Sequence, residues 1–212
     1  MDENSKKADI KILDNVRKAL IKNHFDCEVF LTLDEAKKFI VNKIGRNKKI
    51  GMGGSVTASD MSIADILTRN SNKIYSHNQK MSLEERRKLW LKAIDSDFYI
   101  ASPQAVTRDG KLVFIDGNGN RCAAITWGPK ELILIAGKNK ITRDQDDGLW
   151  RARNIAAIKN NIRLDKKNPC VVSGKCEDCF SPERICNIVT ILWKKPNLTK
   201  VTVVLINEEL GY

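Results

Sequence analysis

Four of the six cysteines in the chain gather in one segment, CVVSGKCEDCFSPERIC, which spans residues 170–186. Thiolates this close together repel one another unless a cation neutralises them, and the intervening glycine and proline let the backbone wrap around it. We therefore predict a metal site formed by Cys170, Cys176, Cys179 and Cys186. The alternatives without a metal are free thiols, or a redox disulfide between Cys176 and Cys179.

The spacing of these cysteines, C-x5-C-x2-C-x6-C, does not choose the metal. A zinc ribbon has two C-x2-C pairs where this segment has one, and the C-x2-C-x2-C run of ferredoxins is absent. The sequence therefore leaves an iron–sulfur cluster and zinc as the two candidates.

A second candidate site is the glycine turn IGMGGSVTASD, residues 50–60, where a strand-like run leads into small hydroxyl residues that open a helix. Backbone N–H groups in such a turn can bind a phosphate or a carboxylate. The turn lacks the lysine of a P-loop, and Val56 stands where the dinucleotide fingerprint has its third glycine. The alternative is a plain helix N-cap with glycines for close packing. The candidate ligand-binding residues are Gly53, Gly54, Ser55 and Thr57.

A third candidate is the polar stretch DGNGNR, residues 116–121, between the apolar runs LVFID (112–116) and RCAAIT (121–126). Its glycines and asparagines predict the tight turn of a β-hairpin. The density of polar side chains indicates a pocket, the alternative being an exposed hairpin tip. The candidates here are Asp116, Asn118, Asn120 and Arg121.

Basic residues near a helix predicted over residues 148–164 form the last candidate set. Lys140, Arg151 and Arg153 could meet an anion, although arginines in surface ion pairs are the more common case. His24 and His77 have no evident partner in the sequence, which argues against a hydrolase built on a histidine base.

Composition excludes several classes of protein. With 212 residues and 42% hydrophobic residues, and without linkers or repeats, the chain predicts one domain. Its apolar runs are too short to span a bilayer and its N-terminus has no apolar leader, so we expect a cytoplasmic protein without membrane contact. The net charge of +11 is spread along the chain in short runs such as Lys48-Lys49 and Lys166-Lys167, which predicts a solvated surface and no nucleic-acid partner.

Strand-like and helical patterns alternate along the chain. Residues 5–22 have helical spacing, and capping boxes at Thr32–Glu35 and Ser82–Glu85 predict two further helices. Strand-like runs occupy 28–31, 49–52, 72–75, 97–101, 131–137, 187–193 and 200–206, and Cys27 and Cys122 fall within strand patterns. This alternation predicts an α/β fold with a mainly parallel mixed sheet.

Together the motifs GMGGSVT, DFYIASPQAVTRDGKLVFIDGNGNRCAAITWGPK, IAGKNKI, RAR, PCVVSGKCEDCFSPERIC and LINEELGY resemble the LUD family, formerly DUF162, which is associated with lactate utilisation. The resemblance implies a single LUD domain over residues 1–212, with a three-layer α/β sandwich of the NagB/RpiA/CoA-transferase type. The glycine turn and DGNGNR match family motifs and would hold a small anionic ligand. The cysteine segment departs from the simplest members.

The resemblance also implies a role. Members of the three-gene lactate-oxidation system work beside iron–sulfur oxidoreductase subunits and oxidise L-lactate to pyruvate, and a homo-oligomer is compatible with such a role. We expect an accessory or electron-transfer component of 2-hydroxyacid oxidation, with the cysteines holding an iron–sulfur cluster. One alternative is a sugar-phosphate or acyl-CoA type enzyme with a structural zinc, although no catalytic glutamate of the CoA-transferase kind is evident. Another is a ligand-sensing regulator.

Overall fold

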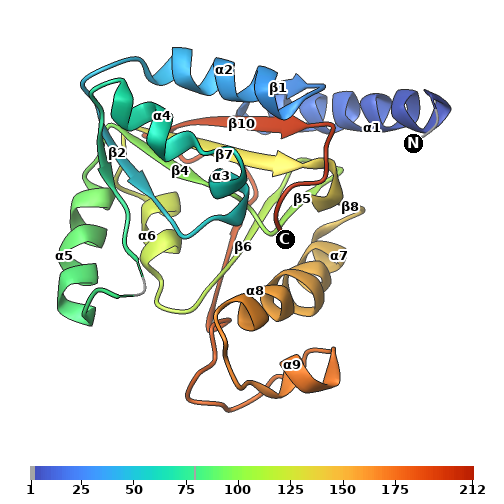
Figure 1. The fold of residues 1–212 in the computed structure, drawn as a ribbon. Helices are drawn as coiled ribbons and strands as arrows, with labels where there is room; N and C mark the ends of the chain where they lie inside the picture. Colours follow the sequence, from blue (N-terminus) through green and yellow to red (C-terminus); the bar gives the residue numbers. More distant parts are fainter. Residues whose placement is uncertain (1–2, 79) are drawn as a thin grey trace.

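The computed structural model describes residues 3–78 and 80–212, and a six-stranded sheet forms its centre (Figure 1). Its strands lie in the order β1-β10-β7-β4-β2-β3, and all neighbouring pairs are parallel. They are β1 (Asp26–Phe30), β2 (Lys49–Met52), β3 (Lys73–Tyr75), β4 (Phe98–Ala101), β7 (Glu131–Gly137) and β10 (Lys200–Ile206). Because every pair is parallel, the carboxyl ends of all six strands meet at one edge of the sheet.

Helices cover both faces of this sheet. One face packs against α2 (Leu33–Ile44), α3 (Val56–Asp60) and α4 (Ile63–Arg69). The other packs against α1 (Glu3–Lys22), α5 (Leu83–Ile94) and α6 (Asn120–Thr126). The capping boxes predicted at Thr32 and Ser82 begin α2 and α5. None of the helices in the described residues is long and apolar enough to cross a membrane.

A second, smaller sheet lies beneath the first, in the order β8-β5-β6-β9. Its strands are β5 (Ala105–Thr107), β6 (Leu112–Asp116), β8 (Ile141–Thr142) and β9 (Ile188–Leu192). Strand β6 is antiparallel to both β5 and β9, and β5 is parallel to β8. The outer face is covered by a continuous helix made of α7 (Gln145–Arg151), a π-helical stretch η2 (Ala152–Ala156) and α8 (Ala157–Arg163).

Two short helical elements complete the chain: η1 (Lys138–Lys140) after β7, and α9 (Pro169–Ser173) after α8. Residues 174–187 follow α9 without a regular helix or strand. Together α9 and this segment form a small lobe at the bottom of the molecule in Figure 1, which we call the cysteine lobe (residues 168–187).

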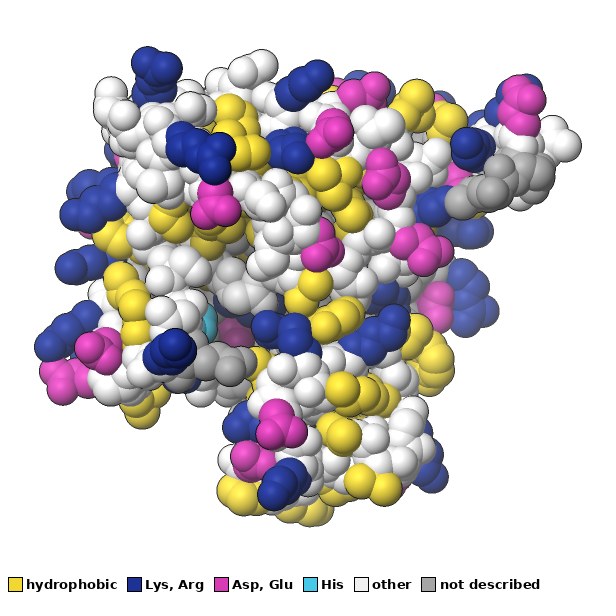
Figure 2. All heavy atoms as spheres, in the orientation of Figure 1, with side chains coloured by type: hydrophobic (Ala, Val, Ile, Leu, Met, Phe, Trp, Pro, Cys, Tyr) yellow, Lys and Arg dark blue, Asp and Glu magenta, His cyan; other side chains and the backbone are white. Residues whose placement is uncertain are grey.

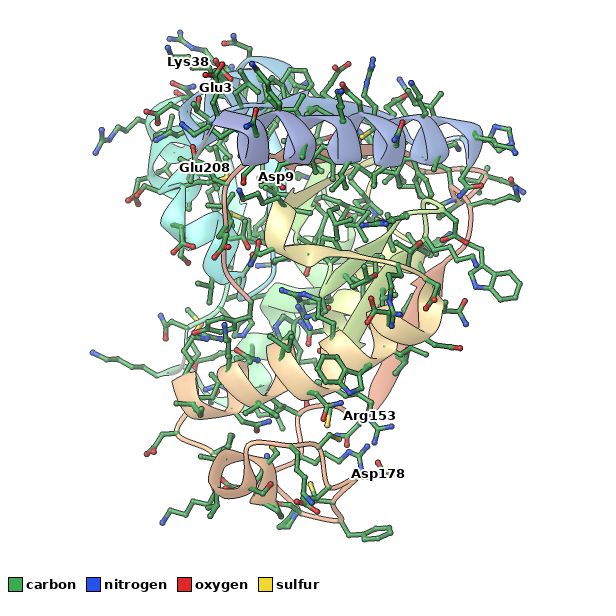
Figure 3. The ribbon with its side chains drawn as sticks, turned by 90° about the vertical axis from the view of Figure 1, so that its right-hand side faces the viewer. Glu3, Asp9, Lys38, Arg153, Asp178 and Glu208 are labelled. Atoms are coloured by element: carbon green, nitrogen blue, oxygen red, sulfur yellow. The ribbon has the colours of Figure 1, made fainter. Side chains whose placement is uncertain are left out.

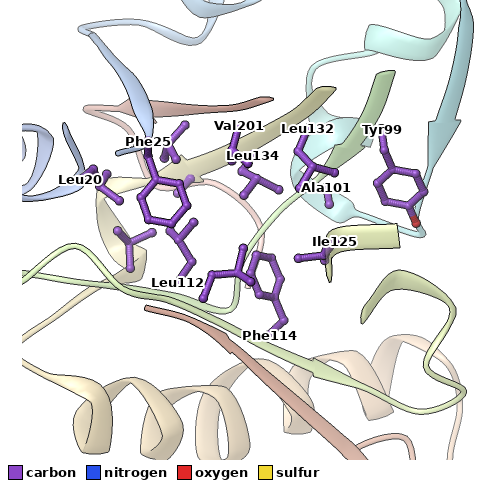
Figure 4. Packing of buried hydrophobic residues seen from close by; sticks show 14 of the residues in the cluster. Leu20, Phe25, Tyr99, Ala101, Leu112, Phe114, Ile125, Leu132, Leu134 and Val201 are labelled. Atoms are coloured by element: carbon purple, nitrogen blue, oxygen red, sulfur yellow. The ribbon is translucent and has the colours of Figure 1, made fainter. Parts of the chain in front are cut away.

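The main core lies between the two sheets. Side chains of β7 alternate, because Leu132 and Leu134 face the second sheet while Ile133 and Ile135 face helices α2–α4. Figure 4 shows Leu112 and Phe114 of β6 packed toward the residues of the central sheet. The predicted fold class, a mainly parallel sheet with helices on both sides, is confirmed, and the antiparallel pairs lie in the second sheet.

The predicted hairpin across residues 112–126 is wrong. Strand β6 pairs with β5 and β9, and residues 120–126 form helix α6. The cause is the Asp116 carboxylate, which accepts the backbone N–H groups of Arg121 at 2.8 Å and Cys122 at 3.1 Å and so stabilises the first turn of α6. The helix then buries Cys122 and Ile125, three residues apart on one face. Cys122 is therefore helical and not part of a strand.

The turn between β5 and β6 docks against the end of α1. Gly110 has φ +81°, and a Cβ there would lie 2.7 Å from the carbonyl carbon of Ala19. The Asn23 side chain donates to the carbonyl oxygens of Asp109 at 2.9 Å and Gly110 at 3.0 Å. Only glycine allows both the left-handed backbone and this close approach.

Gly110→Ala is therefore expected to destabilise the protein more than Gly174→Ala. Gly174 has a similar φ of +71° but nothing within 4 Å of its Cβ position, so alanine there causes only the strain of about 1–2 kcal/mol for the left-handed backbone. Overpacking against α1 should add about 1–3 kcal/mol at Gly110. Urea unfolding of the two variants measures the difference, and equal midpoints would contradict the close docking of α1.

Candidate ligand-binding site

A cavity of about 540 Å³ opens between the central sheet, the helix 145–163 and the cysteine lobe. Its volume lies within the range of about 300–1,000 Å³ that is typical of small-molecule sites. A deeper recess of about 40 Å³ continues from it and shares five of its lining residues, Gly54, Gln104, Arg121, Ala156 and Asn160. Figure 2 shows a hollow above the cysteine lobe with basic side chains beside it.

The glycine turn after β2 forms one wall of the recess. A Cβ at Gly53 would lie 2.7 Å from Cδ of Arg121, so glycine lets the Arg121 side chain pass across the turn. Ser55 begins α3 by accepting the backbone N–H of Ala58 at 3.2 Å, which makes it the expected N-cap. Gly54, Ser55 and Thr57 all line the recess. Because α3 has only five residues, we do not treat its N-terminus as an anion-binding site. What this segment contributes to the recess is the hydroxyl of Thr57.

The polar stretch 116–121 forms the opposite wall, so the structure brings the two predicted motifs together. Asn118, Asn120 and Arg121 line the large cavity, and Arg121 also lines the recess. The Asp116 carboxylate is buried and bonded to three backbone N–H groups, those of Gly117, Arg121 and Cys122. Asp116 thus serves as a helix cap, and Arg121 is the charged side chain of this wall. Arg121 also donates to the carbonyl oxygen of Ile115, and its Nε lies 3.8 Å from Asp116 Oδ1.

Lys140 lies at the floor of the recess with only 2% of its surface exposed. Its Nζ lies 2.6 Å from Oγ of Ser102 and 3.1 Å from Oγ1 of Thr57. None of the ion pairs in residues 3–78 and 80–212 involves Lys140. Burial, together with the positive charges of Arg151 and Arg121, lowers the pKa of Lys140 to about 7.

Two arginines of the helix, Arg151 and Arg153, have separate roles. Arg151 is buried beside Lys140 and donates from Nε to the carbonyl oxygen of Asn139 at 2.9 Å and from Nη1 to that of Gln104, and burial lowers its pKa to about 10. It supports the recess from behind. Arg153 instead contacts the cysteine lobe, where its Nη2 lies 3.0 Å from Oδ1 of Asp178 (Figure 3).

The thiols of the cysteine lobe influence one another electrostatically. Cys170 is buried in α9, and the pKa of its thiol is raised by burial and then by the charges of Cys179, Cys186 and Cys176. Within the described residues, however, no group of three or more His, Cys, Asp or Glu side chains is placed to hold a metal ion. All six thiols are free. The four-cysteine metal site therefore stays a prediction.

The lobe is connected to the cavity through Arg184. Its guanidinium donates to the carbonyl oxygens of Cys179 at 2.7 Å and Cys186 at 3.3 Å, and it pairs with Asp178 at 2.9 Å. Residues 182–185, between the third and fourth cysteines, line the large cavity. The predicted metal segment and the predicted ligand pocket therefore share a wall.

A π-helical turn shapes the helical wall of the cavity. Ala152, Ala156 and Ala157 line the cavity around the π-helical stretch η2, and their small side chains leave room for a ligand. Asn160 and Arg163 of α8 line it one and two turns later. Single π-helical turns within α-helices occur frequently at functional sites.

Two residues of this site, His77 and Ser102, lie outside the predicted set, and only Ser102 has a signal in the sequence. His77, which has no evident partner in the sequence, lines the cavity and accepts at Nδ1 from the Trp90 indole at 3.0 Å, and burial followed by the charge of Arg86 lowers its pKa. Its neutral ring therefore carries the proton on Nε2. Ser102 directly follows β4 at the ligand-binding edge of a parallel sheet, and this position could have identified it.

Comparisons with known proteins show a shared fold and a family. A solved structure of a DUF162 family protein from Deinococcus radiodurans is similar with a TM-score of 0.56 at 11% identity, over 93% of this chain and 98% of that chain, which shows a shared fold. The beta subunit of eIF2B from Chaetomium thermophilum reaches a TM-score of 0.39 at 12% identity over 54% of this chain and 44% of that one, too low to carry an argument. A search of curated proteins found no significant match. The family model of the LUD domain matches residues 13–206, and the chain therefore belongs to the LUD domain family.

Proposed function

We propose that this LUD-domain protein is a component of lactate utilisation that binds a small organic anion, of the 2-hydroxyacid or 2-oxoacid class, in the cavity beside the glycine turn. The observation that carries the proposal is Lys140, a buried basic group without an ion-pair partner in the described residues, at the floor of a recess that Arg121 also lines. An anion in the recess would pair with Arg121 and with the protonated form of Lys140.

The charges around the large cavity support the same class of ligand. Five basic side chains line it, those of Arg86, Arg121, Arg163, Lys166 and Arg184, against the two acids Asp116 and Glu183. Both acids are engaged: Asp116 caps α6, and Glu183 accepts from Lys166 at 3.2 Å and from the backbone N–H of Lys167 at 3.0 Å. The cavity therefore has an excess of positive charge and offers arginine, which binds carboxylates and phosphates in a two-pronged geometry.

The first prediction about function concerns Arg121→Gln. Loss of a charged hydrogen-bond donor costs about 1.5–3 kcal/mol, so the dissociation constant for L-lactate or pyruvate should rise roughly tenfold or more. Isothermal titration calorimetry measures it. Arg143→Gln is the matched control, because Arg143 is exposed and pairs with Asp147 away from the cavity.

The same titration separates the alternatives. Binding of ribose 5-phosphate or coenzyme A, with no binding of lactate or pyruvate, would favour a sugar-phosphate or acyl-CoA type enzyme or a ligand sensor. An affinity for lactate and pyruvate that Arg121→Gln leaves unchanged would contradict the proposed site.

We also propose that the cysteine lobe holds a metal, with an iron–sulfur cluster as the first choice and structural zinc as the second. Four thiols are a donor set that suits either group, and the thiols of Cys176, Cys179 and Cys186 each contribute to the raised pKa of Cys170. Three of them, Cys176, Cys179 and Cys186, lie on irregular backbone that can adjust around a metal. A bound iron–sulfur cluster would supply one-electron transfer.

We propose that the surface of the cysteine lobe binds a protein partner, an iron–sulfur oxidoreductase subunit. Val172 and Phe180 are almost completely exposed on it. The charged residues of the lobe are paired within the molecule: Lys175 with Glu177, Lys166 with Glu183, and Arg184 with Asp178. We propose that the apolar pair, together with these exposed charges, forms the docking surface of the lobe.

The second prediction is that Cys179→Ser abolishes metal binding by protein purified without oxygen, while Cys27→Ala retains it. Cys27 is buried in β1, and burial raises its pKa to about 12, which makes it a poor metal ligand. Metal analysis with an absorption spectrum provides the measurement. Iron with sulfide supports the electron carrier, zinc alone supports a structural role, and wild-type protein without bound metal would contradict the site.

A reconstituted assay then tests the electron-transfer role. If the lobe carries electrons, Cys179→Ser should lose lactate-dependent transfer to the partner subunit while the chain keeps its thermal stability. Transfer that persists in proportion to the folded protein would reduce the cysteines to a structural role.

A further inference from the structure

We propose that Lys140 is a nucleophile that condenses with the carbonyl group of a small 2-oxo acid to form a Schiff base. The proposal rests on the proposed function, because the 2-oxo acid must first enter the cavity. It goes beyond that function by giving the chain covalent chemistry of its own, in a recess where the binding role alone needs only a positive charge.

The hydrogen bonds of Lys140 are compatible with a neutral amine. The Ser102 hydroxyl lies 2.7 Å from the carbonyl oxygen of Ile135 and donates to it, so toward Lys140 it can only accept. The Thr57 hydroxyl lies 3.1 Å from Nζ of Lys140 and 3.3 Å from the Ser102 hydroxyl. It can therefore either accept a hydrogen bond from Lys140 or donate one to it. An NH₂ group that donates to Ser102 and accepts from Thr57 therefore satisfies both contacts.

The charges around Lys140 favour the same neutral form. Arg151 of α7 and Arg121 of α6 both raise the cost of a further positive charge, and Asp60 at the end of α3 is the one acid that opposes them, with the smallest effect. Burial is the largest cause, and the resulting pKa of about 7 leaves roughly half of the amines neutral at neutral pH. A desolvated lysine beside other cations is a recognised way to activate a lysine nucleophile.

The recess has room for the reaction. Its volume of about 40 Å³ exceeds the roughly 10–15 Å³ that one water requires, and Lys140, Thr57 and Ser102 all line it. Arg121 and Asn160 line both the recess and the large cavity, so they stand where the two spaces join. A 2-oxo acid whose carboxylate binds Arg121 can direct its carbonyl carbon toward the amine, while any longer side chain remains in the large cavity.

The step is balanced without an added oxidant or reductant. The lone pair of Nζ attacks the carbonyl carbon, the C–N bond forms, and the π electrons of the carbonyl move to its oxygen, which takes up a proton. The nitrogen loses one proton, the hydroxyl takes up a proton and leaves as water as the C=N bond forms, and the C=N nitrogen then releases its second proton. The net change is the loss of one water from the amine and the ketone. The Thr57 hydroxyl is in contact with Nζ and can relay these protons.

The third prediction tests the covalent bond directly. Wild-type protein incubated with pyruvate and sodium borohydride should gain one reduced adduct, and peptide sequencing should locate it at Lys140. Lys140→Met and Lys140→Arg should lose the adduct. Lys138→Arg should keep it, because Lys138 lies two residues away and its Nζ pairs with Asp9 at 2.7 Å. An adduct on Lys166, the other lysine of the cavity wall, would overturn the assignment to Lys140.

A second measurement does not depend on pyruvate. Acetylation of the wild-type protein by methyl acetyl phosphate, a small anionic reagent, should proceed at Lys140 with a rate that levels off above about pH 7. The rate at Lys130 should continue to rise with pH, because Lys130 is exposed and its bond to Asp97 holds its pKa above the ordinary value. A Lys140 that is unreactive at pH 8, or that follows the profile of Lys130, would overturn the proposal.

Calorimetry separates this inference from the proposed function. If L-lactate and pyruvate bind but borohydride traps nothing at Lys140, the cavity binds the anion and the Schiff base does not form. If neither ligand binds and no adduct forms, both proposals fail for this class of acid.

Discussion

The burial of one amine organises the candidate site. Lys140 joins three segments that are distant in the sequence, because it contacts Thr57 of α3 and Ser102 after β4 from its own position after β7. Without these two hydroxyls the amine would be buried without partners, which is costly. Its pKa is lowered from 10.5 to about 7, so between these values the unfolded chain binds a proton that the folded chain does not. The contribution of Lys140 therefore makes the fold more stable as pH rises from about 7 toward 10.5, and the full penalty applies below pH 7.

The position of the cavity follows from the architecture around that amine. The parallel sheet places the segments after β2, β4 and β7 at one edge, and the second sheet brings the turn after β6 to the same place. The helix 145–163 and the cysteine lobe close the space from the other side. Because Arg184 contacts the backbone of two cysteines and also lines the cavity, a rearrangement of the lobe around a metal would move a wall of the ligand site.

The sequence predicts what is encoded locally. The helices capped by Thr32 and Ser82 each begin with a capping box, which lies within four consecutive residues. The strands of the parallel sheet appear in the sequence as apolar runs. The DGNGNR stretch predicts a turn and a polar pocket, yet the helix after it was missed because its cap comes from Asp116, four residues before its first residue. Asn118, Asn120 and Arg121 are predicted from the density of polar side chains, and Lys140 as a basic residue before a helix; all four line the cavity or its recess. The pairing of His77 with Trp90 depends on how a loop folds onto α5, and no local pattern encodes it.

The π-helical stretch has a geometric consequence for this chain. Such a turn contains one residue more than the α-helix it interrupts, and each residue of an α-helix turns the chain by about 100°. The five residues Ala152–Ala156 therefore occupy the place of about four in a regular helix, and the extra residue is absorbed as a local bulge, so α8 continues α7 with nearly the same orientation. Asn160 and Arg163 of α8 thereby face the cavity while Arg151 of α7 stays beside Lys140. A residue gained or lost in this stretch would change the wall formed by Ala152 and Ala156 and leave the residues on either side of it in place.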